Sequence, residues 1–315
     1  MNPLIFKPIY KERVWGGQKL ATRLDRSIPH DKPIGESWEI VDRKADQSIV
    51  AEGPHKGKTL KQLLESCGAE IMGPQYKQHT PFPLLVKWLD CKDTLSVQVH
   101  PPKDIAPLFN GEPKTENWYI LESDPNAQLY LGLIPQTSLS DFSKAIEQNR
   151  LEPLLACTES QAGDSYLIES GTLHAIGGGN LILEIQQNSD TTYRAYDWNR
   201  LGLDGTPREL HQDKCTKSLI INDLPIKPVR IKGPSSILVD SPQFRITGHT
   251  LTPDCAPLIL PANQSPRLIH VTQGQVTDSL SQQNIQLGDT ALLPYTSEIQ
   301  LTATEPAIVL ITDQF

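Results

Sequence analysis

The sequence predicts a mainly β protein built from two small jelly-roll β-barrels with a few helical insertions, and three observations support this prediction. Its 26 prolines and 20 glycines divide the chain into short segments. Many of these segments are apolar or alternate between apolar and polar residues, as strands do. A Gly-Asp turn followed by an apolar run occurs at Gly163 and again at Gly288. At 315 residues, the chain also exceeds a usual single core, which favours two domains.

Strand-like segments run along the whole chain, whereas helical spacing is restricted to a few places. The clearest strand candidates are residues 37–41, 95–100, 128–133, 181–185, 300–303 and 307–311. Apolar residues recur with helical spacing only at 60–71, 140–149 and 207–220. The helices are therefore expected to be insertions into a β framework.

A proline-rich, basic stretch at 225–234 has the composition of a linker, with the sequence Pro-Ile-Lys-Pro-Val-Arg-Ile-Lys-Gly-Pro. We place the domain boundary there. This predicts a first barrel with the helical insertions at residues 1–225 and a second barrel at residues 226–315.

Composition narrows the classes of partner. The chain has 29 basic and 37 acidic side chains, a formal charge of −8, and no basic block that could follow a phosphate backbone. No apolar run reaches membrane-spanning length, and residues 1–8 lack the apolar core of a signal peptide. We expect a cytoplasmic protein that binds neither nucleic acid nor membrane. Five scattered cysteines without a Cys-x-x-Cys pair predict neither a disulfide framework nor a thiolate zinc site. No pattern predicts an oligomeric state.

One group of polar residues stands out on the predicted strands. Residues 95–100 alternate, so Gln98 and His100 share one face of their strand with Ser96. A carboxylate at Glu116 and a second imidazole at His174 complete four nitrogen or oxygen donors, a set that suits a divalent cation. The sequence therefore predicts one metal site.

The segment from Gly163 to His174 resembles the second motif of the cupin superfamily in its spacing of glycines and histidine. The copy that starts at Gly288 has Ile299 at the position of His174. We therefore expect the second barrel to be free of metal. His270, which lies among apolar residues, is interpreted as structural.

Seven motifs together resemble the type I phosphomannose isomerases, also called mannose-6-phosphate isomerases, and in particular their short bacterial branch. They are, in order, residues 15–17 (Trp-Gly-Gly), 35–39 (Gly-Glu-Ser-Trp-Glu), 83–87 (Pro-Leu-Leu-Val-Lys), 95–101 (Leu-Ser-Val-Gln-Val-His-Pro), 114–119 (Lys-Thr-Glu-Asn-Trp-Tyr), 171–176 (Gly-Thr-Leu-His-Ala-Ile) and 187–194 (Gln-Asn-Ser-Asp-Thr-Thr-Tyr-Arg). The resemblance implies a catalytic cupin domain that binds one Zn²⁺ per chain. It also implies interconversion of mannose 6-phosphate and fructose 6-phosphate through an enediolate.

The resemblance also implies roles for individual residues. It places the zinc ligands at Gln98, His100, Glu116 and His174 and the proposed catalytic pair at Lys114 and Arg194.

The residues themselves leave some of these roles open. Lys114 lies on the same strand face as Glu116, so it suits proton transfer, because a nearby dication lowers the pKa of an ammonium group. It also suits pairing with a substrate phosphate. Arg194 keeps its charge and suits binding a phosphate or stabilising an enediolate, or forming a surface ion pair. Ser96 is a candidate phosphate contact, and Lys87 and Glu36 are candidates for substrate contact or for structural ion pairs.

Two other classes of function fit part of this pattern. Two histidines and a carboxylate also form the facial triad of Fe(II) oxygenases, but the additional ligand Gln98 and the cationic pair argue against open coordination positions for oxygen chemistry. A non-catalytic cupin that only binds a sugar phosphate would keep the fold, but it would need neither the full ligand set nor Lys114.

Overall fold

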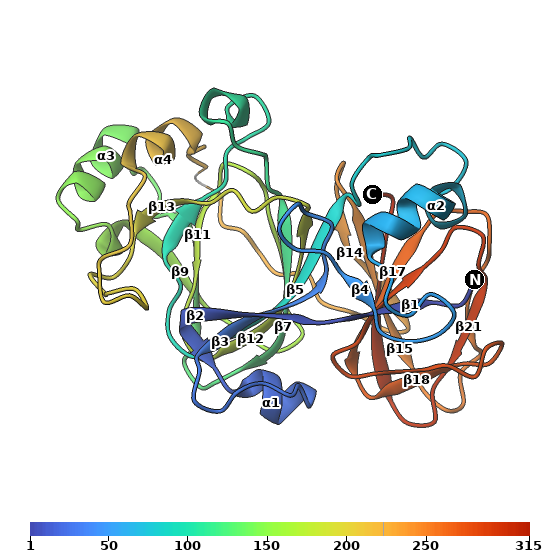
Figure 1. Cartoon of the computed structure of the whole chain (residues 1–315). Helices are drawn as coiled ribbons and strands as arrows, with labels where there is room; N and C mark the ends of the chain where they lie inside the picture. Colours follow the sequence, from blue (N-terminus) through green and yellow to red (C-terminus); the bar gives the residue numbers. More distant parts are fainter. Residues whose placement is uncertain (223) are drawn as a thin grey trace. The chain divides into compact units, whose positions relative to one another are not determined.

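The computed structural model describes residues 1–222 and 224–315 of this chain, and it is mainly β as predicted (Figure 1). The chain divides into two compact units. The central unit contains residues Tyr10–Ser37 and Lys87–Pro228. The terminal unit contains Met1–Ile9, Trp38–Val86 and Val229–Phe315.

The central unit is built on two antiparallel sheets. The strand order of the six-stranded sheet is β10 (Ser165–Ile168), β7 (Glu116–Ser123), β12 (Asn180–Gln187), β5 (Leu84–Cys91), β2 (Ile9–Gly17) and β3 (Ile34–Ile40), of which β2, β3 and β5 also have residues in the terminal unit. The order of the five-stranded sheet is β13 (Tyr193–Tyr196), β6 (Val97–Val99), β11 (Leu173–Ile176), β8 (Gln128–Leu133) and β9 (Leu155–Glu159).

Apolar residues from both of these sheets form one buried cluster. Trp118 and Ile182 come from the six-stranded sheet, and Leu129 and Ile176 come from the five-stranded sheet. A second cluster packs α3 (Leu139–Glu147) and α4 (Gln212–Ser218) onto the five-stranded sheet. The sheets therefore have a rigid apolar support, and polar side chains at their ends can be held in fixed positions.

The terminal unit also contains two antiparallel sheets. The seven-stranded sheet has the order β14 (Ser235–Asp240), β15 (Arg245–Leu251), β22 (Ala307–Asp313), β17 (Arg267–Gln273), β20 (Thr290–Leu293), β1 (Leu4–Lys7) and β4 (Ile49–Val50). The four-stranded sheet has the order β16 (Leu258–Leu260), β21 (Ile299–Thr302), β18 (Gln275–Asp278) and β19 (Asn284–Gln286). One apolar cluster joins strands of both sheets.

This arrangement groups residues that precede the predicted boundary at 225/226 with the C-terminal strands. Strand β1 pairs directly with β20, with Leu4 opposite Leu292. Residues 1–9 and 38–86 therefore belong to the same compact unit as Val229–Phe315. The seven-stranded sheet is completed by two strands from the N-terminal part of the chain.

Two of the three predicted helices are found, and both begin with a capping box. The helix expected at 60–71 is α2 (Leu60–Met72), and the one expected at 140–149 is α3. Thr59 and Ser138 each cap their helix through a reciprocal pair of side-chain and backbone hydrogen bonds. Such caps satisfy amide groups that have no partner inside the helix.

The helix predicted at 207–220 is wrong in extent, because the structure has only α4 (Gln212–Ser218) there. Pro207 instead pairs with Leu201 in an isolated β-bridge. The amide of His211 donates to the carbonyl of Arg194 at 2.8 Å, which ties the chain to β13 just before the helix begins. Three short helical turns were not predicted: α1 (Lys19–Leu24) and the 3₁₀ turns Ala106–Phe109 and Glu152–Leu154.

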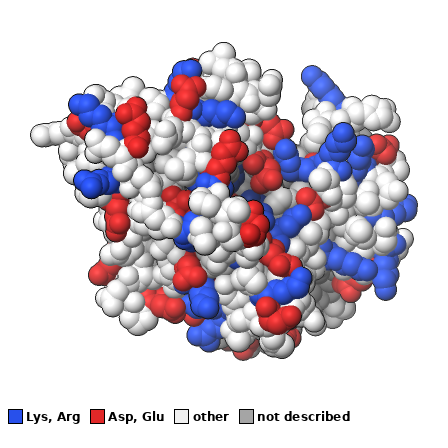
Figure 2. Space-filling view, turned by 60° about the vertical axis from the view of Figure 1, so that its left-hand side comes forward, with Lys and Arg blue, Asp and Glu red and all other residues white. Residues whose placement is uncertain are grey.

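Charged side chains of both signs are mixed on the face of the molecule that Figure 2 shows. Among the helices of residues 1–222 and 224–315, none has the length and apolar character needed to span a bilayer.

Candidate metal centre

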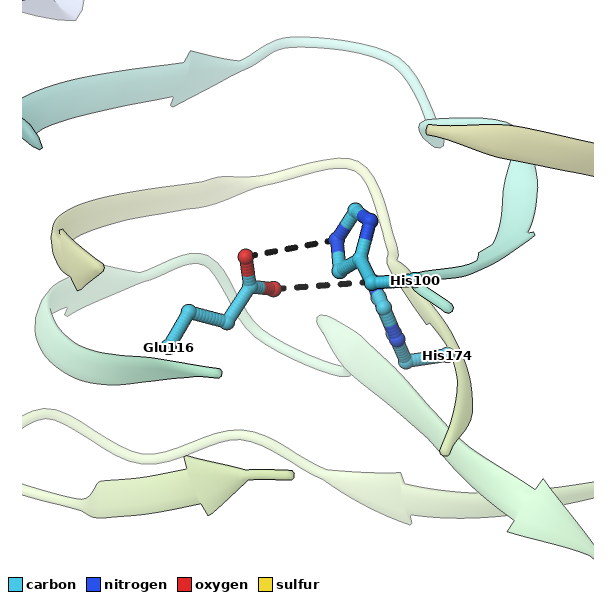
Figure 3. A group of neighbouring side chains, drawn as sticks. All are labelled: His100, Glu116 and His174. Carbon is cyan, nitrogen blue, oxygen red and sulfur yellow. Dashed lines mark ion pairs between the residues drawn. The ribbon is translucent and has the colours of Figure 1, made fainter. Parts of the chain in front are cut away.

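Three of the predicted ligands meet in the central unit. His100 follows β6, Glu116 begins β7, and His174 lies on β11. Figure 3 shows the carboxylate of Glu116 pointing toward both imidazole rings. Glu116 Oε2 lies 3.4 Å from His100 Nε2, and Glu116 Oε1 lies 3.5 Å from His174 Nε2. The candidate ligand atoms of the three residues all lie within 4.8 Å of one another.

The fourth predicted ligand lies beside this cluster. Gln98 on β6 is directly opposite His174 on β11 in the antiparallel register. Its side-chain amide nitrogen lies 3.2 Å from His174 Nε2. Gln98 also lines the pocket described below, so it connects the buried cluster with the solvent side.

The hydrogen bonds of the two histidines fix which ring nitrogen has a lone pair. His100 Nδ1 donates to the carbonyl of Thr191 at 2.8 Å, and His174 Nδ1 donates to the carbonyl of Thr172 at 2.9 Å. A carbonyl oxygen only accepts, so Nδ1 carries the proton in both rings. Both Nε2 lone pairs therefore face Glu116, as in metal-binding histidines whose other nitrogen is held by a carbonyl.

Burial makes this cluster unfavourable unless something else is bound. His100, Glu116 and His174 are at most 1% exposed. Within the described residues, His100 Nε2 and Glu116 Oε1 make no hydrogen bond. Buried polar atoms without partners destabilise a fold by a few kcal/mol. Two imidazole nitrogens, one carboxylate and one amide form a donor set that fits a divalent cation such as zinc.

The protonation states also suit a metal site. Burial lowers the pKa of His100 to about 3, and the nearby Lys114 acts in the same direction. Burial likewise lowers the pKa of His174. Burial alone would raise the pKa of Glu116, but Lys114 and the two histidines hold it well below its usual range. Near neutral pH the cluster therefore has two neutral imidazoles and one carboxylate, the forms that bind metals.

The cluster adjoins a pocket of about 560 Å³ in the central unit. Six of the predicted site residues line this pocket: Glu36, Lys87, Ser96, Gln98, Lys114 and Arg194. Lys114 also contacts the buried cluster, because its Nζ lies 2.6 Å from Glu116 Oε2. The structure thus brings all nine predicted residues into the cluster or the wall of the adjoining pocket.

Glu184 is a buried pocket residue that was not predicted. Its carboxylate lies 3.3 Å from Lys87 Nζ and 3.6 Å from Lys114 Nζ, and it accepts a hydrogen bond from the indole of Trp118 at 3.3 Å. Burial raises the pKa of Glu184, and Glu116 adds to this effect. The only sequence signal was one acidic residue in the otherwise apolar strand segment 181–185.

Glu184 changes the electrostatic setting of Lys114. Burial would lower the pKa of Lys114, but Glu116 and Glu184 raise it above its usual value. Repulsion from a bound dication, on which the prediction from the sequence rests, would act in the opposite direction and lower this pKa. Lys114 therefore lies in a balanced group of two ammonium and two carboxylate groups with Lys87, Glu116 and Glu184.

Other predicted residues have partners in the pocket wall. Both carboxylate oxygens of Glu36 accept hydrogen bonds from Arg13, at 2.9 and 3.0 Å. Arg194 donates from Nη1 to the carbonyl of Glu209 at 2.7 Å. Arg208, which was not predicted, lines the same pocket and binds Asp197 through Nε at 2.8 Å.

Three arginines lie around Asp197 near the Arg194 end of this pocket. Asp197 is shared between Arg208 and Arg200. Burial lowers the pKa of Arg194, and the neighbouring Arg208 adds to the effect. Asp190 and Asp204 also line this pocket, so its guanidinium groups lie among carboxylates as well.

His270, in the terminal unit, is fully buried, and both ring nitrogens lie 3.0 Å from threonine hydroxyls, those of Thr290 and Thr312. Its polar atoms are thus satisfied within the protein, in agreement with a structural role.

Comparisons with known proteins agree with this architecture. The catalytic-domain model of type I phosphomannose isomerase matches residues 4–144. The probable mannose-6-phosphate isomerase GmuF of Bacillus subtilis (strain 168) is 43% identical over 222 residues, which is 70% of this chain and 69% of that protein. The mannose-6-phosphate isomerase of Streptococcus mutans is 34% identical over 309 residues, with 94% of this chain and 93% of that protein covered.

Solved structures extend the likeness to almost the whole chain. The crystal structure of the mannose 6-phosphate isomerase from Bacillus subtilis has a TM-score of 0.86 and 31% identity, and the match covers 99% of both chains. A zinc-bound mannose 6-phosphate isomerase has a TM-score of 0.78 at 15% identity, with 98% of this chain and 99% of that chain covered, which shows a shared fold. The resemblance seen in the sequence motifs is confirmed. This chain belongs to the type I phosphomannose isomerase family, the mannose-6-phosphate isomerases.

Proposed function

We propose that this chain interconverts mannose 6-phosphate and fructose 6-phosphate through an enediolate in the pocket of its central unit. The observation that carries this proposal is the buried His100, Glu116 and His174 cluster, whose ligand atoms lie within 4.8 Å of one another beside a pocket lined by basic and acidic side chains. The relatives named as mannose-6-phosphate isomerases support the choice of substrate.

We propose Gln98, His100, Glu116 and His174 as the ligands of one Zn²⁺ ion. Nitrogen and oxygen donors with one carboxylate would leave a bound cation with net positive charge, because no thiolate neutralises it. A bound zinc ion would supply Lewis acidity that polarises a carbonyl or hydroxyl oxygen of the sugar. The zinc-bound structure of a mannose 6-phosphate isomerase with this fold supports the choice of metal.

Lys114 is the proposed residue for proton transfer, because a bound dication would oppose the carboxylates that raise its pKa and would favour the neutral amine. The isomerisation removes a proton from C2 of the aldose and returns a proton to C1. Lys114 Nζ lines the pocket and is held between Glu116 and Glu184, so its position would be fixed beside a bound sugar. A positioned ammonium group can also stabilise the negative charge of an enediolate.

The other end of the pocket is the proposed phosphate site. Arg194 and Arg208 both line the pocket, and Asp197 is shared between Arg208 and Arg200. A guanidinium group binds phosphate with two parallel hydrogen bonds and keeps its charge. Ser96 also lines the pocket and could donate to a phosphate oxygen. Binding of this remote group would help to position the reacting carbons.

Lys87 and Glu36 are proposed to contact the sugar from the wall between these two ends. Their ion pairs with Glu184 and Arg13 hold the two side chains in place. Ammonium and carboxylate groups held in this way could bind sugar hydroxyls.

The test is an isomerase assay combined with metal analysis. Purified protein should contain about one Zn²⁺ per chain and convert mannose 6-phosphate to fructose 6-phosphate, and removal of the metal with a chelator should abolish turnover. Bound iron with oxygen consumption would instead support the oxygenase. Tight binding of mannose 6-phosphate without turnover by zinc-loaded protein would support the non-catalytic cupin.

A further inference from the structure

The turn between β12 and β13 connects the six-stranded sheet with the five-stranded sheet and ends near Arg194. Its sequence at 187–192 is Gln-Asn-Ser-Asp-Thr-Thr. Ser189 in this turn is only 1% exposed despite its hydroxyl group. Buried hydroxyl groups are retained where they make hydrogen bonds, so the partners of this turn identify its role.

Two hydroxyl groups of the turn hold one residue of another segment. Ser189 Oγ donates to the carbonyl of Glu112 at 3.2 Å, and the amide of Glu112 donates to Thr191 Oγ1 at 3.0 Å. Both backbone groups of Glu112 are thus bound by side chains of the turn. Glu112 lies two residues before Lys114 and four before Glu116, so this contact fixes the approach to β7.

Glycine at position 111 allows the two segments to approach this closely. A Cβ atom there would lie 2.6 Å from Tyr193 Oη and 3.0 Å from Thr191 Cγ2. Any larger residue at Gly111 would therefore push the segment of Glu112 away from the turn.

The turn is also fixed internally. The amide of Thr191 donates to Ser189 Oγ at 3.2 Å, and the amide of Ser189 donates to the carbonyl of Gln187 at 2.7 Å. The buried side chain of Gln186 donates to the carbonyls of Gln187 and Ser189 at 2.8 and 2.7 Å. Gln186 is itself directly opposite Glu116 in the register of β12 and β7.

This turn ends in the carbonyl group that orients His100. The carbonyl of Thr191 accepts the hydrogen bond from His100 Nδ1, and that bond sets the direction of the Nε2 lone pair. His174 has a local partner, the carbonyl of Thr172, two residues earlier. His100 depends instead on a carbonyl 91 residues further along the chain.

We propose that Ser189 and Thr191 are positioning residues for metal binding, because their hydroxyl groups hold the Thr191 carbonyl against His100 and hold the segment that leads to Glu116. This inference rests on the proposed ligand set. It predicts that removing either hydroxyl group weakens metal binding even though neither side chain is a ligand.

The decisive measurement is the affinity for Zn²⁺ alone, determined by competition with a chromogenic chelator on the full-length protein. Thr191→Val and Ser189→Ala should each lower that affinity between tenfold and a hundredfold, the usual effect of losing a group that orients a ligand. Thr191→Ser keeps the hydroxyl group and should stay within about threefold of the unchanged protein, below the range expected for a lost orienting group.

Thr94→Val is the matched control. Thr94 is a partly buried threonine of the same unit, and its Oγ1 accepts one backbone hydrogen bond, from Gly178 at 3.3 Å. It should lower thermal stability like Thr191→Val but leave Zn²⁺ affinity unchanged. The shift in melting temperature that saturating Zn²⁺ produces should shrink for Thr191→Val and stay constant for Thr94→Val.

The outcomes separate this inference from the ligand assignment. If His100→Ala loses Zn²⁺ while Thr191→Val and Ser189→Ala bind it normally, the positioning role is wrong and the ligand set stands. If Thr191→Ser loses as much affinity as Thr191→Val, the methyl packing and not the hydroxyl group is responsible, and the inference also fails. If His100→Ala binds Zn²⁺ normally, the ligand set itself is wrong. Should Thr191→Val not fold, Ser189→Ala provides the same measurement.

Discussion

Gln98 and His174 lie directly opposite each other on neighbouring antiparallel strands, with 3.2 Å between the amide nitrogen of Gln98 and His174 Nε2. The pairing of β6 with β11 therefore places two candidate ligands next to each other. A slip of one residue in this register would turn one of them to the opposite face of the sheet. The apolar clusters on both faces of the five-stranded sheet prevent such a slip, because it would expose apolar side chains.

Loss of either histidine ligand should remove the metal. We expect His100→Ala and His174→Ala to lose most of the bound Zn²⁺ and at least about a hundredfold in kcat/KM, because each removes a nitrogen donor that no nearby group replaces. Metal content by mass spectrometry and an isomerase assay measure this. His270→Gln is the control and should retain full metal, and full metal in His100→Ala would show that the ligand assignment is incorrect.

Glu184 should stabilise the fold through Lys87 and Lys114. Glu184→Gln removes the carboxylate that both ammonium groups face, and we expect the free energy of unfolding to fall by roughly 3 kcal/mol, as when one partner of a buried ion pair is removed. Denaturant unfolding measures the change. The double variant Glu184→Gln/Lys87→Met should recover part of this loss, because it also removes one buried charge. Strictly additive losses would contradict the coupling.

Arg208 should determine selectivity for a phosphorylated sugar. We expect Arg208→Gln to raise KM for mannose 6-phosphate at least tenfold and to weaken competitive inhibition by inorganic phosphate, since a guanidinium–phosphate contact contributes about 1.5–3 kcal/mol. We expect unphosphorylated mannose to be a poor substrate of both proteins, and Arg208→Gln should change its kcat/KM little.

Arg245→Gln is the matched control for charge. Arg245 binds Asp240 through Nε and Nη2, both at 3.1 Å, on the surface of the terminal unit. This variant should keep the KM of the unchanged protein. Equal inhibition by phosphate in the Arg208 variant and the unchanged protein would place the phosphate elsewhere.

His270 should make stability depend on pH. Burial lowers its pKa to about 3, whereas an unfolded histidine titrates near 6.5. As the pH falls from about 6.5 to 3, the unfolded chain binds a proton that the folded chain does not, so the free energy of unfolding falls by about 1.4 kcal/mol per pH unit from this residue. Denaturant unfolding measures the free energy of unfolding of the unchanged protein and of His270→Gln. Below pH 6, the advantage of the unchanged protein should shrink by about 1.4 kcal/mol for each pH unit. A pH-independent difference would mean that His270 has the same pKa in the folded and unfolded states.

Truncation should show that the three segments of the terminal unit fold cooperatively. A chain that ends at Lys232 loses β14 to β22, whereas β1, β4 and α2 remain without the sheet they pack on. We expect aggregation and binding of a dye specific for apolar surface. A soluble, monomeric truncated chain with unchanged thermal stability would contradict this expectation.

The sequence alone determined the β framework and the family, and it predicted the candidate ligands. Alternation at 95–100 placed Gln98 and His100 on one face, although the strand that forms, β6, is only Val97–Val99. The helical spacing of apolar residues at 60–71 and 140–149 located two helices to within a few residues. These properties depend on local spacing and on residue type, which a single chain displays directly.

Tertiary structure decided which groups face each other. The pairing of β1 with β20 joins residues that are far apart in sequence, and it groups residues 38–86 with the C-terminal strands. Two further contacts join residues that are 70 or more positions apart. Glu184 lies between Lys87 and Lys114, and the carbonyl of Thr191 accepts a hydrogen bond from His100. Such contacts depend on how sheets pack and on the favourable pairing of buried charges and polar groups with one another, which local patterns in the sequence do not specify.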